Sequence, residues 1–123
     1  MANATASHPV SGAAYQLRLM RERRADNQAR LRTLEMRLFH EAEAATRSNP
    51  GLPSTFGRYA SDWTKRHEAD FQRRLSELRA AARNEIGSIA QKITRQSDAI
   101  AAFHLKQARK AKRSNHGTRP SHL

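Results

Sequence analysis

Apolar residues at helical spacing predict a first helix from Ala13 to about Arg47. Its seam positions are spaced alternately three and four residues apart, as in a coiled coil. They are Leu17, Met20, Arg24, Asn27, Leu31, Leu34 and Leu38. The two polar members, Arg24 and Asn27, either fix the register of the seam or form an exposed turn of the helix, and we favour the exposed turn.

A turn-forming segment ends this helix. Residues 48–53 place two prolines around Gly51, and the residue before a proline is disfavoured in helical conformation. Ser54 or Thr55 is then positioned to cap a second helix. Two helices joined by a short loop pack antiparallel, so we expect an all-α fold with a coiled-coil-like helical hairpin over residues 12–105.

The second periodic segment is longer than the first and extends to about Leu105. Its apolar-face positions are Trp63, His67, Phe71, Leu75, Leu78, Ala82, Ile86, Ile89, Ile93, Ile100 and Phe103. With Gln96 counted as a member, nine steps lead from Phe71 to Phe103, and their average of about 3.6 residues is that of a straight helix. The pair Gly87-Ser88 lies in the middle, and such pairs are sites of kinks. We therefore expect this helix to be kinked or broken near Gly87.

The second helix outruns the first by about 20 Å, at 1.5 Å rise per residue. Ile93, Ile100 and Phe103 lie in that overhang, where the first helix cannot cover them. Either the chain folds back near Gly87 into a three-helix bundle, or a partner covers the apolar face. We expect a homo-oligomer or a larger protein assembly, with a partner interface at Ile89, Ile93, Ile100 and Phe103.

The two ends of the chain differ from the helical region. Residues 1–11 lack periodicity and contain Pro9, so we expect a flexible arm, with Ser11 as a helix cap. Residues 106–123 hold six basic residues and no acidic one, which is half of the formal net charge of +12. We expect a flexible basic tail. Its bases are Lys106, Arg109, Lys110, Lys112, Arg113 and Arg119.

A run of bases without counter-charges fits a polyanion, because phosphate contacts release condensed counterions without reading sequence. We therefore expect nonspecific binding of DNA or RNA by the tail. A solubilising or protein-docking tail and an anionic membrane are alternative interpretations of the same charge. For the whole protein, the alternative is a structural adaptor or stalk in a larger machine, a secretion apparatus or a virion, with no nucleic-acid role.

A second basic patch contains aromatic residues. It consists of Arg58, Tyr59, Trp63, Lys65 and Arg66. Aromatics at helical spacing usually pack, so we expect Tyr59 and Trp63 to pack against Phe39 and Phe56. Stacking on nucleobases is the alternative. Arg73 and Arg74 are spaced to pair with Asp70 and Glu77 along a solvated helix face.

Catalytic and metal-binding patterns are absent from the sequence. There is no cysteine, and no two of the six histidines have the helical spacing of a metal pair. His67 lies on the apolar face and is expected at the rim of the core. We expect a non-enzymatic protein without a cofactor or metal. No signal peptide or membrane-spanning run is visible, so we expect an intracellular (cytoplasmic) or virion-associated protein.

Overall fold

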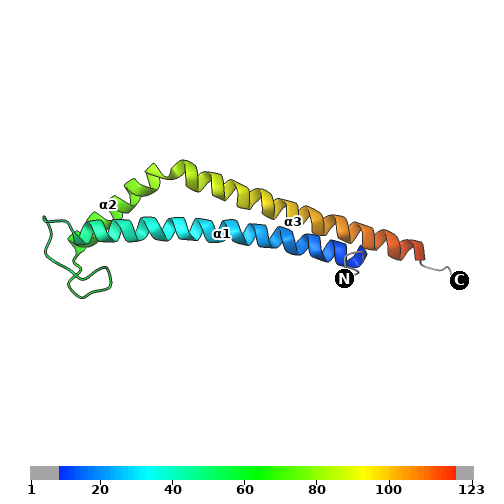
Figure 1. Cartoon of the computed structure of the whole chain (residues 1–123), viewed down its shortest axis with the longest axis horizontal. Helices are drawn as coiled ribbons and strands as arrows, with labels where there is room; N and C mark the ends of the chain where they lie inside the picture. The colour runs from blue at the N-terminus through cyan, green and yellow to red at the C-terminus, as the bar shows by residue number, and fades with distance from the viewer. Residues whose placement is uncertain (1–8, 119–123) are drawn as a thin grey trace, which may run out of the picture. The chain divides into compact units, whose positions relative to one another are not determined.

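The computed structural model describes residues 9–118, which form three helices and no strand (Figure 1). The helices are α1 (Pro9–Arg47), α2 (Lys65–Ala81) and α3 (Arg83–Thr118). The expected all-α fold is confirmed for these residues. The chain divides into two compact units, and we describe each by itself. In the described range the first unit combines residues 9–27 with 91–118, and the second comprises residues 28–90.

In the first unit, the beginning of α1 lies antiparallel to the end of α3 (Figure 1). Three side-chain hydrogen bonds join the two helices, with residue numbers rising along one helix as they fall along the other. These are Asn27 Nδ2 to Gln96 Oε1 (3.1 Å), Arg24 Nη1 to Ser97 Oγ (3.3 Å), and Arg21 Nη2 with His104 Nε2 (3.4 Å). Arg24 and Asn27 therefore lie at the helix contact, and the exposed turn that we expected there is wrong.

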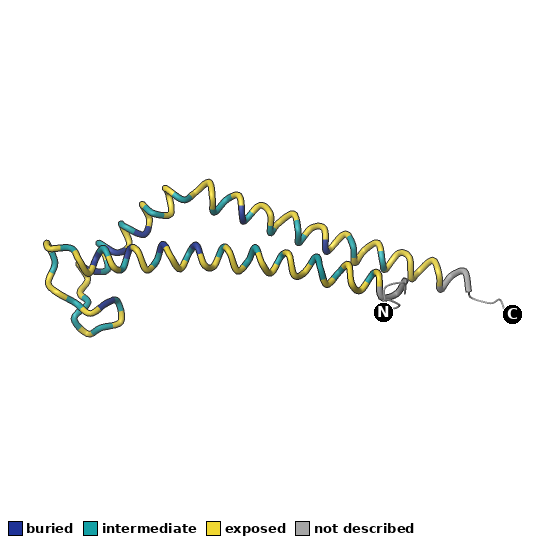
Figure 2. Tube along the Cα trace, in the orientation of Figure 1, coloured by how far each residue is buried: buried dark blue, intermediate teal, exposed yellow. Residues whose placement is uncertain are grey.

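The second unit contains most of the buried residues, as Figure 2 shows. Phe71 is fully buried at the centre of an aromatic cluster, with ring centroids 5.0 Å from Phe39 and 6.0 Å from Trp63. Aliphatic side chains from all three helices extend this core. They are Leu34, Leu38, Ala42, Leu75 and Ile89. Leu34 and Leu38 come from the predicted seam of the first helix, and their burial accounts for the apolar part of the seam after Asn27.

The loop between α1 and α2 is longer than expected. It spans residues 48–64, and the cap of α2 is Thr64 rather than Ser54 or Thr55. The Thr64 side chain accepts from the His67 backbone N–H, and the His67 ring accepts from the Thr64 backbone N–H. This reciprocal capping box satisfies two donors that a helix start leaves unpaired. Thr55 instead donates to Asp62 at 2.7 Å within the loop.

The break in the second predicted helix falls at Ala82, five residues before Gly87. Ala82 has φ −94° and ψ 9°, and its N–H bonds to the carbonyl of Leu78. The chain changes direction between α2 and α3 (Figure 1). Gly87 lies inside α3, which continues through it. Nothing in the type of residue at Ala82 explains why the break falls there.

Both flanking segments are more helical than expected. α1 begins at Pro9, so residues 9–11 are not a flexible arm and Ser11 is no cap. A proline is well tolerated in the first turn, because its missing N–H would have no helical partner there. α3 continues to Thr118, which corrects the flexible tail for residues 106–118. Ala, Lys, Arg and Gln favour helix strongly in that stretch. The arm before Pro9 and the tail after Thr118 lie outside the described residues.

The predicted apolar overhang is not exposed. Ile89 and Ile100 are buried within the chain, with 4% and 6% of their surface accessible, and Ile93 and Phe103 are half-buried. Ile100 lies between the two points where α3 contacts Arg24 and Arg21 of α1. The early start of α1 and the long loop place α1 against this part of α3. Ile89 and Ile100 are therefore covered within the chain, whereas Ile93 and Phe103 keep partial exposure and their place in a partner interface stays a prediction.

Candidate nucleic-acid interface

The two units differ sharply in charge. In the described range, the first unit carries eleven Lys and Arg against three Asp and Glu, and the second carries eleven against eight. The ion pairs between described residues lie in the second unit. They join Arg58 to Glu68, Arg73 to Asp70 and Glu77, Arg74 to Asp70, and Arg79 to Glu35. Positive charge is thus largely compensated in the second unit and remains in excess in the first.

The excess charge in the first unit is organised along one face of α3. Positions spaced alternately by three and four residues share a helix face, and here they run from residue 92 to residue 113, about 32 Å at 1.5 Å per residue. The seven positions of this row hold five exposed bases, two exposed alanines and no acid. Beside the row, Lys110 follows Lys106 by four residues and adds a sixth exposed base, and Asp98 follows Arg95 by three residues and adds one acid. We call the six bases the basic stripe: Lys92, Arg95, Lys106, Arg109, Lys110 and Arg113. Ala99 and Ala102 separate its two groups of bases.

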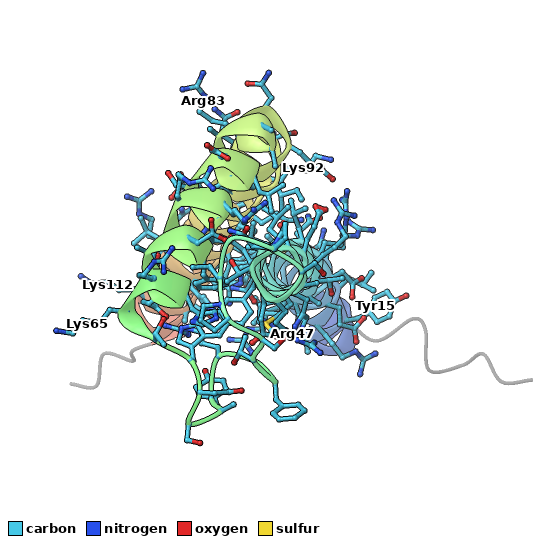
Figure 3. The ribbon with its side chains drawn as sticks, turned by 90° about the vertical axis from the view of Figure 1, so that its left-hand side faces the viewer. Tyr15, Arg47, Lys65, Arg83, Lys92 and Lys112 are labelled. Carbon is cyan, nitrogen blue, oxygen red and sulfur yellow. The ribbon has the colours of Figure 1, made fainter. Side chains whose placement is uncertain are left out.

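The basic stripe differs from the tail that the sequence predicted. Four predicted residues belong to it, whereas Lys112 projects to a different side from Lys92 (Figure 3). Arg119 lies outside the described residues. Lys92 and Arg95 were missed because they precede the uninterrupted run of bases. The signal that would have found them is the heptad spacing of bases and alanines on the solvent side of the helix.

A shallow depression lies on the surface of α3 within the stripe. Its walls are Ala102, Leu105, Lys106, Arg109, Lys110 and Arg113. Leu105 is 53% exposed there, so the depression pairs a small apolar patch with four cations. Such a surface can contact a sugar or a lipid chain as well as a phosphate, but the cations dominate it. An anion approaching this face meets no carboxylate among the residues that line it.

Three of the four arginines of α1 in the first unit contact other side chains of the protein. The Arg18 guanidinium lies 5.4 Å from the ring centroid of Tyr15 on the same helix, while Arg21 and Arg24 bond to α3. Arg21 and Arg24 therefore hold the two helices together with cationic side chains and without a carboxylate. All four arginines add positive charge to the first unit.

Two acids of the second unit, Glu68 and Asp70, are held ionised by their neighbours. Hydrogen bonds from Gln72 and Arg58, with a further one from Trp63, lower the pKa of Glu68 from 4.5 to about 2. Partial burial opposes ionisation of Asp70, but hydrogen bonds from Arg74, Thr46 and Arg73 outweigh it and lower its pKa to about 2. The expected pairing of Arg73 and Arg74 with Asp70 and Glu77 is confirmed. These charges stabilise the second unit and are engaged within it.

His67 is a structural residue of the second unit. It is fully buried and stacks on Trp63 at 5.3 Å between ring centroids. Nδ1 accepts the Thr64 N–H, so Nε2 carries the proton that bonds the Pro53 carbonyl at 2.8 Å. His67 is therefore buried more deeply than the position at the rim of the core that we expected. Both ring nitrogens are used in holding the loop to α2.

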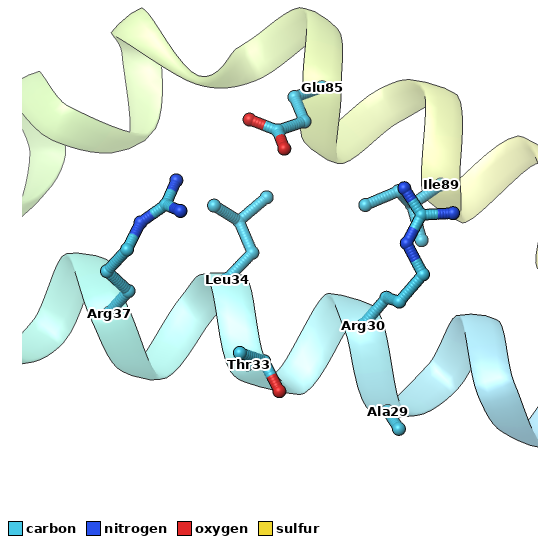
Figure 4. A pocket seen from close by; sticks show the side chains of 7 residues that line it. All are labelled: Ala29, Arg30, Thr33, Leu34, Arg37, Glu85 and Ile89. Atoms are coloured by element: carbon cyan, nitrogen blue, oxygen red, sulfur yellow. The ribbon is translucent and has the colours of Figure 1, made fainter.

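A second depression lies between α1 and α3 within the second unit (Figure 4). Leu34 and Ile89 supply apolar surface, Arg30 and Arg37 extend from α1, and Glu85 points in from α3 (Figure 4). One carboxylate between two guanidinium groups gives this cleft mixed charge. It contains no pair of carboxylates and no nucleophile beside a base, so its residues do not define a reaction.

Two other kinds of site can be checked on residues 9–118. No helix in this range is both long enough and apolar enough to cross a membrane. No three potential metal-ligating side chains of the described chain come together. No known protein family, curated protein or solved structure matches the chain. The basic stripe is thus the surface with the clearest chemical preference, and that preference is for polyanions.

Proposed function

We propose that this protein binds the phosphate backbone of nucleic acid through the basic stripe, without catalysis and without reading base sequence. The observation that carries the proposal is the exposed row of α3 positions that holds five of the six stripe bases and no acid. The stripe is displayed on a regular helix, so neighbouring bases are held at fixed separations. Each phosphate contact releases condensed counterions, which supplies the binding free energy.

The absence of sequence reading follows from the side chains that the stripe presents. Lysine and arginine contact phosphates readily and among the bases read mainly guanine, whereas recognition of adenine and cytosine in a groove uses Asn, Gln or acidic side chains. The stripe has none of these. We therefore expect similar affinities for duplexes of different sequence. In this account the second unit contributes a stable, nearly charge-balanced support for α3.

The adaptor alternative relied on an uncovered apolar face of the second predicted helix. Ile89 and Ile100 of that face are buried inside the chain, so a partner has no access to them in this fold. Oligomerisation remains a prediction. The stripe itself does not depend on it, because all six bases belong to one helix of one chain.

Two variants matched in the number of charges that they remove test the proposal. The stripe variant K106Q/R109Q/R113Q and the control R32Q/R37Q/R83Q each remove three exposed positive charges. We expect the stripe variant to lose at least about tenfold in affinity for a blunt DNA duplex at moderate salt, and the control to lose much less. Fluorescence anisotropy measures both. Equal losses would show that only net charge matters, and would contradict a specific role for the stripe.

A further inference from the structure

Two aromatic side chains of the loop between α1 and α2 are almost fully exposed. Phe56 is 88% accessible and Tyr59 is 89% accessible. Trp63 packs as expected in an aromatic cluster, but its partner there is Phe71, where we expected Phe39 and Phe56. Tyr59 and Phe56 do not join that cluster, which corrects the packing that we expected for them. Each ring exposes nearly its whole surface, so both are open to contact by a ligand. They are separated in sequence by only Gly57 and Arg58.

The loop that carries these rings is held in one conformation. Asp62 accepts from the Thr55 hydroxyl at 2.7 Å and from the Phe56 N–H at 3.4 Å. Gly57 has φ +136°, a conformation that side-chain-bearing residues rarely adopt. The Arg58 N–H donates to Glu43 Oε2 at 3.1 Å. A ligand that contacts the rings therefore meets a loop that is already ordered, which lowers the entropic cost of binding.

Around the loop that carries the rings, bases outnumber acids by four to three. The Arg58 guanidinium lies 5.8 Å from the Tyr59 ring centroid and is also bonded to Glu68. Arg47, Lys65 and Arg66 flank the loop with exposed side chains. The acids of this region, Glu43, Asp62 and Glu68, all accept hydrogen bonds from loop or helix groups. The surface thus offers open aromatic faces beside cations.

We propose that Phe56 and Tyr59 form a second nucleic-acid contact that stacks on unpaired bases. Aromatic faces with neighbouring cations are the chemistry that binds single strands, because every base has a π-face and every nucleotide a phosphate. An apolar pocket on a partner protein would accept the two rings equally well, but it would gain nothing from the basic side chains that surround them. The inference rests on the proposed function for its class of ligand, although it uses different residues on the other unit.

The test compares single-stranded oligothymidine with a blunt duplex of the same length. Removing both rings in F56A/Y59A should weaken single-strand binding by about 25-fold or more and change duplex binding less than twofold. F56L/Y59L keeps apolar bulk without π-faces and should lose most of the same affinity. Y15A removes a half-exposed aromatic from the first unit and should leave single-strand binding unchanged. Circular dichroism confirms that each variant is folded.

The failures of the two proposals are distinguishable. Single-strand affinity that is unchanged in F56A/Y59A, or fully retained in F56L/Y59L, would overturn base stacking while leaving duplex binding by the stripe intact. An equal loss for both ligands would overturn it too, since the rings would then not select unpaired bases. A wild-type protein that binds neither ligand would overturn the proposed function together with this inference.

Discussion

At the scale of single residues, polar side chains make many of the contacts between elements that apolar side chains make in larger cores. Arg24 and Asn27 join two helices in the first unit, and His67 joins the loop to α2 in the second. Each is placed so that its donors and acceptors meet partners. No buried side-chain nitrogen or oxygen among the described residues lacks a partner. Such contacts fix register even where few apolar atoms are buried.

Acid should destabilise the second unit through Glu68 and Asp70. Both carboxyl groups have a folded-state pKa of about 2, below the ordinary values of 4.5 and 3.8. Their stabilising contribution is therefore fully present above about pH 4.5 and is lost as the pH falls toward 2. We expect urea unfolding midpoints to fall over that range. The single tryptophan, Trp63, donates to Glu68 at 2.9 Å, so its fluorescence reports the transition directly.

The control for the acid prediction is E68Q, which removes one of the two titrating groups. It should be less stable than the wild type at neutral pH and lose less stability on acidification. A wild-type unfolding midpoint that stays constant from pH 5 to 2 would contradict the account.

At the scale of elements, the sequence predicted α1 and its seam well, because a leucine pattern and a Pro-Gly stop are local signals. The start of α2 was not predictable from capping residues alone. Thr55, Thr64 and Ser54 are all suitable caps, and the choice depends on Asp62 capturing Thr55 and on His67 completing the box at Thr64. We predicted the helix break near Gly87 because glycine weakens a helix, but this rule gives no reason for the break at Ala82.

The candidate site was predictable in part for a similar reason. The run of bases from Lys106 to Arg113 is visible in any composition window. Lys92 and Arg95 join that surface only because α3 is one uninterrupted helix, in which Lys92 and Lys110, five full turns apart, lie on one face. The exposed rings of Phe56 and Tyr59 were missed because helical periodicity was extended into residues that form a loop.

Replacing Gly87 with alanine should stabilise the protein. Gly87 lies inside α3, and a Cβ at this position would have no heavy atom within 4 Å. The gain is about 0.5–1 kcal/mol, because alanine loses less backbone entropy in a helix. Urea unfolding followed by circular dichroism measures it. Gly57→Ala is the contrasting variant and should destabilise, since its φ of +136° strains any residue with a Cβ. A destabilised Gly87→Ala would show that α3 needs the glycine.

At the scale of the whole molecule, the division of charge is the property that carries the proposed function. The formal net charge is +12, and eight of those charges belong to the described part of the first unit. That unit buries a single apolar side chain, Ile100, among the residues whose burial is described. Its stability therefore depends on few contacts. A second copy of the chain or a polyanion that bound the folded unit would stabilise it further.

The salt dependence of duplex binding tests the central claim most directly. If all six stripe bases contact phosphates, the logarithm of the binding constant should fall with the logarithm of salt concentration at a slope of about −5. The stripe variant K106Q/R109Q/R113Q, with three bases left, should have roughly half that slope. Binding with a slope near zero, or no duplex binding at low salt, would contradict the account.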